Sequence, residues 1–325
     1  MDKKFQVMQY LKTNLFMSEM DILKFASTAP HRYKFYQIAK RNGKGFRDIS
    51  HPSSELKYIQ SILSKKLEEI FPIHGKAIAY RRNLSIKDNA LLHVGNRYLL
   101  KLDLEDFFPS IDDELISLML VKNDIYLSDI DLELFLNLVL LKKKRKRKRT
   151  LTIGAPTSPI ISNFIMYIFD CEMDNFCESK KIAYSRYADD LSFSSQNKND
   201  LYLIENFAKA IFKEYYSNKL HINNQKTTFV HKGNNRFLTG VKINEEDNIT
   251  LGRNKKRDIY ACVHNILVKK KYTDIDFLQS LIGKINFFIF IQPSFENELN
   301  KKYKINVLEE LKNIGRSIPP KEKSS

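Results

Sequence analysis

The sequence contains no tryptophan, and it has few cysteines, glycines and prolines for its length. There are 3 Cys, 10 Gly and 9 Pro in 325 residues, of which 43% are hydrophobic. The three cysteines, Cys171, Cys177 and Cys262, form no Cys-x-x-Cys pair and are odd in number, which argues against a disulfide framework or a structural zinc site. The composition also excludes a collagenous or low-complexity chain. We expect a folded protein with a sizeable core in a reducing compartment.

Long hydrophobic runs are also missing. The apolar stretches, such as Phe287 to Ile291, are far shorter than the roughly 20 residues that a membrane-spanning helix needs. The N-terminal segment MDKKFQVMQYLKTN has no apolar region typical of a signal peptide. These features predict a soluble, cytoplasmic protein without a membrane partner.

Acidic residues are outnumbered by basic ones, 38 to 54, which gives a net charge of +16. Eight consecutive basic residues, Lys142 to Arg149, supply half of this excess. A single basic cluster is best explained as a solvated surface, but several clusters interleaved with aromatic residues indicate a polyanionic partner. The run itself is not expected to pack, because like charges repel, and it could also serve as a nuclear address or an anionic-membrane patch. Our hypothesis is that it contacts template or structured RNA.

Hydrophobic periodicity in the first half of the chain predicts both helices and strands. Residues 5–40 are expected to be helical, a hairpin follows around Gly43 and Gly45, and Pro52 precedes another helix. In the segment 98–106, three leucines alternate with charged residues, which is typical of a half-buried strand with an acidic outer face. Ser110 and Asp113 then resemble a capping box for the next helix.

The second half begins with a loop that contains glycine and two prolines. Ser158 and Pro159 are suited to the N-cap and first turn of a helix. Residues 183–195 are expected to form two short strands joined by a tight turn at 187–190. A helix over 201–216, a strand near 226–230, a hairpin over 237–251 and a helical tail after residue 252 complete the prediction.

Three carboxylates are the candidate chemical centre. Asp103 lies on the polar side of one predicted strand, and Asp189 and Asp190 lie at the hairpin turn. If these strands are neighbours, the carboxylates converge and need cations, and a set of oxygen ligands suits Mg²⁺ or Mn²⁺. Two such ions would support transfer of a nucleotide to a nucleic-acid hydroxyl. Alternatively, each feature alone is explained as a solvated strand residue or a turn signal.

The order of these segments resembles a known family. LKLDLEDFFPSI, GAPTSPIISN and YADD are similar to motifs A, B and C of reverse transcriptases. NALLH at 89–93 resembles the NAxxH signature of bacterial retron reverse transcriptases, and Leu238-Thr239-Gly240 resembles their VTG triplet, with Leu in place of Val. The resemblance implies an α+β right-hand polymerase architecture with fingers, an RRM-like antiparallel-sheet palm and a helical thumb. The implied boundaries are 1–97 for N-terminal helices and fingers, 98–241 for the palm with an inserted fingers segment at about 113–153, and 242–325 for the thumb.

The resemblance also implies roles for individual residues. Asp103, Asp189 and Asp190, with the Leu104 carbonyl, would hold two Mg²⁺ or Mn²⁺ ions, and Lys226 would protonate the departing pyrophosphate. Phe108 would be the steric gate against ribonucleotides. The remaining implied contacts are Lys44, Arg47, Gly154 and Pro156 with the incoming nucleotide, and Asn89, His93, Leu238, Thr239, Gly240, Arg253, Lys255, Lys256 and Arg257 with RNA. Asn89 and His93, four residues apart, could instead make local structural contacts.

The implied function is RNA-directed DNA synthesis from dNTPs. A retron enzyme binds a structured non-coding RNA, starts from a 2′-hydroxyl of a branching guanosine and makes an RNA–DNA hybrid called msDNA, in anti-phage defence with an effector protein. Alternatives are a group II intron-like or abortive-infection-type reverse transcriptase, a non-catalytic RNA-binding scaffold, and a nucleic-acid binder defined only by its charge.

Overall fold

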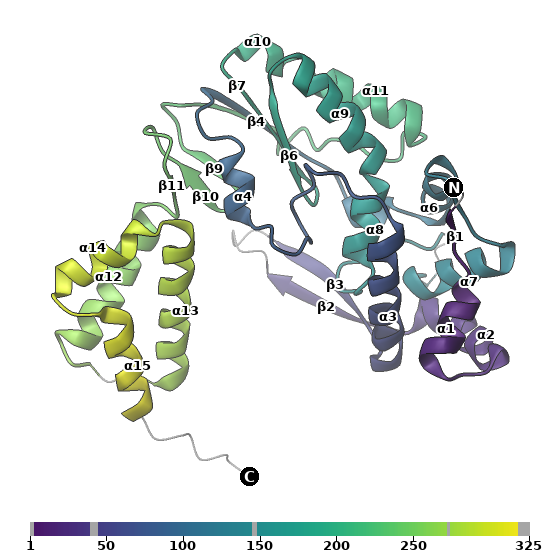
Figure 1. Ribbon diagram of the computed structural model, residues 1–325, viewed down its shortest axis with the longest axis horizontal. Coiled ribbons are helices and arrows are strands. Elements are labelled where there is room, and N and C mark those ends of the chain that lie inside the picture. The colour runs from purple at the N-terminus through teal and green to yellow at the C-terminus, as the bar shows by residue number, and fades with distance from the viewer. Residues whose placement is uncertain (1–2, 40–44, 145–147, 272–273, 318–325) are drawn as a thin grey trace. The chain divides into compact units, whose positions relative to one another are not determined.

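The computed structural model describes residues 3–39, 45–144, 148–271 and 274–317. The chain divides into two compact units (Figure 1). The first comprises residues 1–83 and 100–229, and the second comprises 84–99 and 230–325. Both units mix helices with antiparallel strands, as expected for the α+β class.

The first unit contains most of the secondary structure. Its helices are α1 (Val7–Leu15), α2 (Glu19–Thr28), the 3₁₀ helix η1 (Ala29–His31), α3 (Ser54–Ile70), α5 (Phe107–Ser110), α6 (Asp113–Lys122), α7 (Asp129–Val139), α8 (Ser158–Ile165), α9 (Tyr167–Ser179), α10 (Lys198–Leu201) and α11 (Ile204–Tyr215). Its strands are β1 (Lys3–Lys4), β2 (Tyr33–Ala39), β3 (Phe46–Pro52), β4 (Tyr98–Asp103), β5 (Ile125–Tyr126), β6 (Ala183–Tyr187), β7 (Asp190–Ser195) and β8 (Thr228–His231), of which β4 and β8 extend into the second unit.

A four-stranded sheet with the order β6-β7-β4-β8 forms the centre of the first unit. Helix α9 contacts both β6 and α11, and Figure 1 shows α9 and α11 side by side next to this sheet. In β4 the predicted alternation is confirmed, since Leu100 and Leu102 are buried while Lys101 and Asp103 are half-buried. The apolar face thus fixes which side chains of β4 remain accessible.

The N-terminal prediction of a helix over 5–40 is only partly correct. Helices α1 and α2 form as expected, but residues 33–39 form β2, which pairs antiparallel with β3 from Tyr33↔Pro52 to Ala39↔Phe46. Aromatic and β-branched residues in both segments favour pairing as strands, and this cross-strand pairing prevails over the helical spacing. The predicted turn residue Gly43 lies outside the described residues.

Two predicted helix caps differ from the structure. Helix α6 begins after Asp112, whose carboxylate accepts a hydrogen bond from the Leu115 N–H, whereas Ser110 ends the preceding short helix α5. Helix α8 begins at Ser158, but its N-cap is Thr157 and no side chain caps the helix. Aspartate and serine are about equally favourable N-cap residues. The sequence alone therefore does not determine whether Ser110 or Asp112 caps α6.

The second unit combines a small sheet with a helical bundle. Its elements are α4 (Ile86–Leu91), β9 (Arg236–Leu238), β10 (Val241–Ile243), β11 (Ile249–Thr250), α12 (Arg253–Leu267), α13 (Ile275–Ile291), α14 (Ser294–Tyr303) and α15 (Val307–Ser317). The predicted single hairpin over 237–251 is instead a three-stranded sheet with the order β11-β10-β9. The predicted helical tail is confirmed, and its apolar residues, including Val263, Leu278 and Phe288, share one core.

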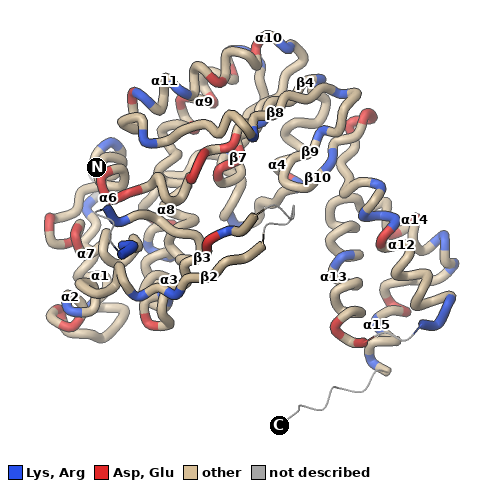
Figure 2. Tube along the Cα trace, turned by 180° about the vertical axis from the view of Figure 1, so that it is seen from behind, with Lys and Arg blue, Asp and Glu red and all other residues tan. Residues whose placement is uncertain are grey.

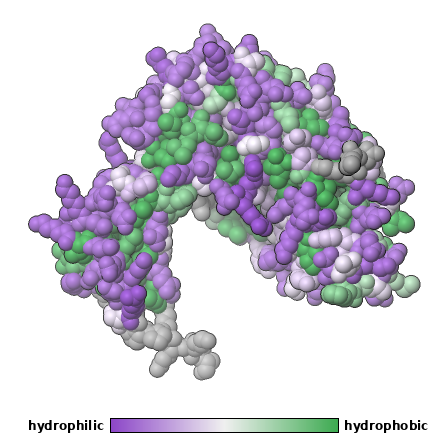
Figure 3. Space-filling model, in the orientation of Figure 1, coloured by the Kyte–Doolittle hydropathy of each residue, from purple (hydrophilic) through white to green (hydrophobic). Residues whose placement is uncertain are grey.

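The surface of the helical bundle is mostly polar. Its visible face in Figure 3 is largely hydrophilic, with hydrophobic groups between the hydrophilic residues. Among the described helices, none is both long and apolar enough to cross a membrane.

Candidate active site

Asp103 lies at the end of β4 beside a lysine. Its side chain is 13% exposed, and its carboxylate accepts a hydrogen bond of 2.6 Å from Nζ of Lys226. Lys226 precedes β8, the neighbour of β4 in the sheet. The hydrogen bond to Asp103 raises the pKa of Lys226, so this lysine is a cation that neutralises the first of the three carboxylates.

The turn between β6 and β7 carries Asp189 and Asp190. Tyr187 pairs with Asp190, which leaves a two-residue turn in which Ala188 has φ of 58°. The Asp189 carbonyl accepts a hydrogen bond of 3.1 Å from the Leu104 N–H, which ties this turn to the end of β4. The structure therefore brings Asp103, Asp189 and Asp190 together at one end of adjacent strands. Figure 2 shows acidic residues gathered beside the label of β7.

The proximity of these carboxylates changes their proton affinities. Loss of hydration and the negative charge of Asp103 raise the pKa of Asp189, although its own backbone N–H and Lys226 act in the opposite direction. Asp190 keeps contact with solvent, yet loss of water around its carboxyl, followed by repulsion from Asp189 and Asp103, raises its pKa to about 6. The negative charges of Asp189 and Asp190 are thus unfavourable beside Asp103, and a further cation at the site would stabilise them.

This repulsion predicts a pH-dependent stability in the absence of divalent ions. Because the folded-state pKa of Asp190 lies above its ordinary value of 3.8, its contribution to stability is fully present below that value and is lost as the pH rises through about 6. Asp190→Asn should remove this loss. The check is the unfolding midpoint between pH 4 and pH 7 in chelator, where parent and variant curves of identical slope would contradict the prediction.

The donor chemistry of the site fits hard divalent cations. All three side chains offer carboxylate oxygens, which Mg²⁺ and Mn²⁺ prefer. In the described part of the chain, no group of three or more His, Cys, Asp or Glu side chains is arranged to hold a metal ion as it stands. Lys226 supplies the positive charge at Asp103 instead, so a cation bound there would compete with this lysine.

Two phenylalanines follow the first carboxylate. Phe107 is buried, whereas Phe108 is half-buried, and their rings meet edge to face at 5.5 Å between centroids in the short helix α5. Asp106 before them has φ of 44°, and this sharp bend turns the chain away from β4. Phe107 thus belongs to the core, and Phe108 remains partly accessible.

Residues from the β2–β3 hairpin lie close to the carboxylates. The positive charge of Arg47, in β3, lowers the pKa of Asp189. The Ser50 N–H in the same strand donates to the Ile153 carbonyl at 3.0 Å. Gly154 then passes so close that a Cβ atom would lie 2.9 Å from the Ser50 carbonyl oxygen, and its φ of 115° also favours glycine. Lys44 lies outside the described residues.

The loop before α8 buries polar groups. Pro156 is half-buried, and the hydroxyl oxygens of the buried residues Thr157 and Ser158 have no hydrogen-bond partner among the described residues. Buried hydroxyls are normally paired. This loop therefore has two donors in place for a bound polar group or water.

The residues expected to contact RNA in the second unit fall into two groups. Asn89 and His93 are 0% and 1% exposed, and α4 ends at Leu91, so they do not share a helix face as expected. Leu238 is buried, and the turn at Thr239 and Gly240 has positive φ at both residues. The Asn89 amide lies 3.5 Å from the Thr239 hydroxyl, an arrangement that favours the local structural alternative over direct RNA contact.

The basic residues that open α12 form the second group. Arg253, Lys255 and Arg257 are exposed, and the Lys255 ammonium donates to the Gly240 carbonyl at 3.4 Å. Lys256 is less accessible, because it forms an ion pair with Glu298 and lies over the Phe295 ring. Three of these four side chains can therefore reach an anionic ligand.

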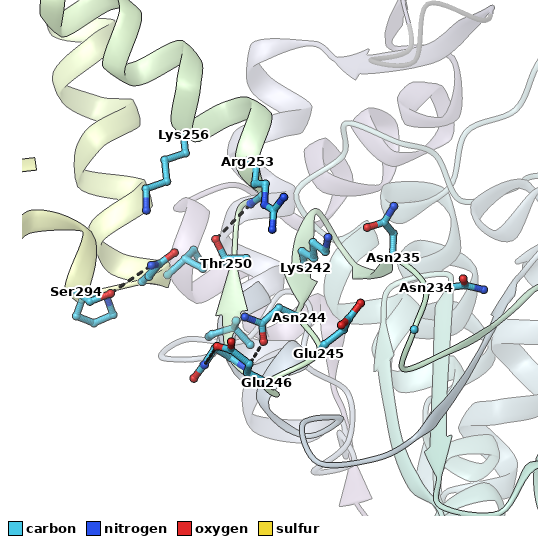
Figure 4. Close-up of a pocket in the computed structure, with 17 residues that line it drawn as sticks. Asn234, Asn235, Lys242, Asn244, Glu245, Glu246, Thr250, Arg253, Lys256 and Ser294 are labelled. Atoms are coloured by element: carbon cyan, nitrogen blue, oxygen red, sulfur yellow. Dashed lines mark hydrogen bonds between the residues drawn. The ribbon is translucent and has the colours of Figure 1, made fainter. Parts of the chain in front are cut away.

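A polar pocket of about 720 Å³ lies beside these residues within the second unit (Figure 4). Arg253, Lys242 and Lys256 line it together with asparagines from the β9–β10–β11 region and the acidic residues Glu245 and Glu246. Cations and carboxylates nearly balance in its lining. The pocket is thus polar without a marked preference for anions.

The basic run is partly engaged in ion pairs. The Lys148 ammonium lies 2.9 Å from Glu114, and Arg149 lies 2.7 Å from Glu133 and 3.3 Å from Asp113. The expectation that the run does not pack is therefore wrong for its last two residues, because acidic side chains of α6 and α7 supply the opposite charge. Lys142, Lys143 and Lys144 are exposed, and residues 145–147 lie outside the described residues.

Comparison with known proteins decides the family. Residues 38–279, well over half of the chain, match the family model described as reverse transcriptase (RNA-dependent DNA polymerase). The chain belongs to the reverse transcriptase family. Its right-hand polymerase fold and its activity as an RNA-directed DNA polymerase follow from this membership.

The relatives identify this reverse transcriptase as retron-type. It is 36% identical to the retron Ec83 reverse transcriptase of Escherichia coli over 90% of this chain and 94% of the relative. It is 35% identical to the retron Ec73 reverse transcriptase of the same organism, over 91% of this chain and 92% of the relative. A solved structure of telomerase from Candida albicans, in complex with a fragment of telomeric RNA, is 12% identical with a TM-score of 0.47 and covers 97% of this chain and 72% of that one.

Proposed function

We propose that this reverse transcriptase binds a structured retron non-coding RNA and synthesises msDNA from a 2′-hydroxyl within it. The observation that carries the proposal is the convergence of Asp103 with Asp189 and Asp190 in a chain 36% identical over most of its length to a retron enzyme. A role in anti-phage defence with an effector protein, in the cytoplasm, completes the proposal.

The carboxylates are proposed to act as the catalytic residues. Asp103 and Asp189 are direct ligands of two Mg²⁺ or Mn²⁺ ions, with the Leu104 carbonyl as a further ligand and Asp190 in support. When bound, such ions activate the attacking hydroxyl and stabilise the leaving oxygen in an in-line displacement. Asp103 would hold the cation with the carboxylate that now accepts the hydrogen bond from Lys226, and the lysine would then be free to contact the phosphates of the nucleotide.

Lys226 is proposed as the proton donor to the departing pyrophosphate. The ordinary pKa of a lysine, 10.5, keeps the ammonium protonated at neutral pH even without the bond to Asp103, so a proton is held at Nζ until the negative charge of the leaving group develops.

The nucleotide is proposed to lie between the carboxylates and the β2–β3 hairpin. Arg47 and Lys44 bind its triphosphate, because guanidinium and ammonium groups suit phosphate oxygens. Gly154 and Pro156 border its base and the template, and the ring of Phe108 lies under its sugar.

The domain roles are also part of the proposal. Residues 1–97 form N-terminal helices and fingers, 98–241 the palm with an inserted fingers segment at about 113–153, and 242–325 an RNA-binding thumb. The exposed cations Arg253, Lys255 and Arg257 contact RNA phosphates, which suits recognition of an A-form stem by shape. Lys256 supports them through its ion pair with Glu298.

The experiment that tests the msDNA proposal is the analysis of nucleic acid that copurifies with the protein from its native host. We expect a branched RNA–DNA species whose DNA is lost when Asp189→Asn replaces the parent. Copurified RNA without linked DNA, from an active parent enzyme, would contradict the retron-specific proposal while leaving the polymerase activity intact.

The exposed part of the basic run should strengthen RNA binding. Replacing Lys142, Lys143 and Lys144 together with glutamine should weaken binding and reduce the slope of log affinity against log salt by about 2 to 3, since each phosphate contact contributes ~0.7–0.9. The matched control replaces three exposed lysines elsewhere, Lys24, Lys57 and Lys180. Equal slopes for both triple variants, measured by filter binding, would contradict a specific role for the run.

A further inference from the structure

An ion pair lies completely buried below the turn that carries Asp189. Arg186, in β6, and Asp170, in α9, are both 0% exposed. The guanidinium Nη2 lies 2.6 Å from Asp170 Oδ2, and Nε lies 2.8 Å from Oδ1. The Tyr184 hydroxyl donates to the same carboxylate at 2.7 Å, so the buried charge is paired and held in a fixed orientation.

The third nitrogen of Arg186 reaches the turn itself. Nη1 donates to the Ala188 carbonyl at 3.2 Å and to Asn163 Oδ1 at 3.0 Å. The Asn163 amide in turn donates to the Ala79 carbonyl at 2.9 Å, which fixes the orientation of its side chain. Arg186 therefore connects three segments, α8, α9 and the β6–β7 turn, through one planar group.

The Ala188 carbonyl belongs to the peptide group that leads into Asp189. In a trans peptide the C=O and the N–H point in opposite directions. The hydrogen bond from Arg186 to the Ala188 carbonyl therefore also fixes the direction of the Asp189 N–H. That N–H stabilises the Asp189 carboxylate. On its other side, Asp189 is held by the bond from the Leu104 N–H to its carbonyl.

The hydrogen bond from Arg186 to the Ala188 carbonyl also stabilises a strained backbone conformation in the turn. Ala188 has φ of 58°, a conformation that residues with a side chain adopt at a cost and that persists only where the surroundings enforce it. The guanidinium supplies a charge-assisted bond at this residue. Without it, the turn has access to less strained conformations in which Asp189 points elsewhere.

We propose that Arg186 is a positioning residue that fixes the Asp189 carboxylate for metal binding by holding the Ala188 peptide from below. This inference rests on the proposed role of Asp189 as a metal ligand. Asp170 and Asn163 orient the guanidinium, and none of the three touches the substrate.

The test must separate positioning from simple stability, because removing Arg186 alone leaves Asp170 buried and unpaired. Two variants serve. In the triple variant Asp170→Leu, Tyr184→Phe and Arg186→Met, the ion pair and its tyrosine partner are replaced by apolar side chains, a kind of exchange that often preserves stability, while Asn163 keeps its bond to the Ala79 carbonyl. Arg186→Lys keeps the charge beside Asp170 but lacks the planar fork that reaches both Ala188 and Asn163. Tyr184→Phe is the control, since it removes a bond to Asp170 without touching the turn.

The measurements are the unfolding midpoint, RNA affinity, the single-turnover rate of dNTP incorporation and the Mg²⁺ concentration for half-maximal rate. We expect Arg186→Lys and the triple variant to lose about 100-fold in rate, as for a misplacement of about 1 Å, with a higher Mg²⁺ requirement and unchanged RNA affinity. Tyr184→Phe should keep the parental rate and Mg²⁺ requirement even where its midpoint falls.

A parental rate and Mg²⁺ requirement in Arg186→Lys would overturn the inference, because a merely structural role needs only the charge. Loss of rate in proportion to the fall in midpoint across all three variants would overturn it as well. Failure of the proposed metal site is distinguishable, since it would appear as full activity of Asp189→Asn.

Discussion

Asp189→Asn is expected to lower dNTP incorporation at least about 1,000-fold, which corresponds to ~4 kcal/mol of transition-state stabilisation. The amide that replaces the carboxylate is a weaker ligand for Mg²⁺ and carries no negative charge. Stability should not fall. Because burial and Asp103 raise the pKa of Asp189, its charge is unfavourable in the folded protein, and neutralising it removes repulsion.

The measurement is primer extension on an RNA template with Mg²⁺, together with the unfolding midpoint of the same preparations. Glu178→Gln is the matched control, because it makes the same kind of change at an exposed position at the end of α9. Full activity of Asp189→Asn with normal metal dependence would refute the assignment of the active site.

Phe108→Val is expected to raise the incorporation of ribonucleotides relative to deoxyribonucleotides by about 100-fold, the upper range of discrimination that a change of a few carbon atoms provides. The half-buried ring follows Asp103 in α5, where it would fill the space below the sugar. A smaller side chain leaves room for the 2′-hydroxyl without removing any charged group from the site.

The ratio of kcat/KM for ATP and dATP on the same template gives the result. Phe107→Leu is the control, because Phe107 is buried beside Phe108 and its truncation should lower stability by ~1 kcal/mol without changing the ratio. An unchanged ratio in Phe108→Val, or an equal change in Phe107→Leu, would rule out the gate.

The sequence predicts the central part of the fold well, because local signals and tertiary structure agree there. Alternating leucines define β4, and the short strands around 187–190 are found as predicted. Asp103, Asp189 and Asp190 are single residues in well-defined local contexts, so their convergence depends only on adjacent strands. The sheet order β6-β7-β4-β8 provides this adjacency.

Other parts of the structure depend on contacts that local patterns do not contain. The strand β2 is stabilised by pairing with β3, and the cap of α6 comes from Asp112 rather than Ser110. Arg186 is directly adjacent to the YADD segment, but its burial against Asp170 joins residues 16 positions apart. An arginine within the short strand over 183–187, which carries no other charge, is the available signal, since such a charge is buried only when it is paired.

The same reasoning applies to Asn89 and His93. Their spacing indicates a shared helix face, but α4 ends before His93 and both side chains are buried. Spacing alone does not reveal which face of a short helix packs against a neighbouring sheet. Here α4 contacts β9, β10 and β11, and the side chains of Asn89 and His93 are buried inside the second unit.

Anomalous scattering from crystals grown with Mn²⁺ and a dNTP would show whether the carboxylates of β4 and of the β6–β7 turn hold a pair of divalent ions. We expect two peaks about 3.5–4 Å apart, both within ligand distance of Asp103 and Asp189, with Lys226 displaced from Asp103. Peaks remote from these carboxylates, or an intact Asp103–Lys226 pair in a crystal with ordered dNTP, would contradict it.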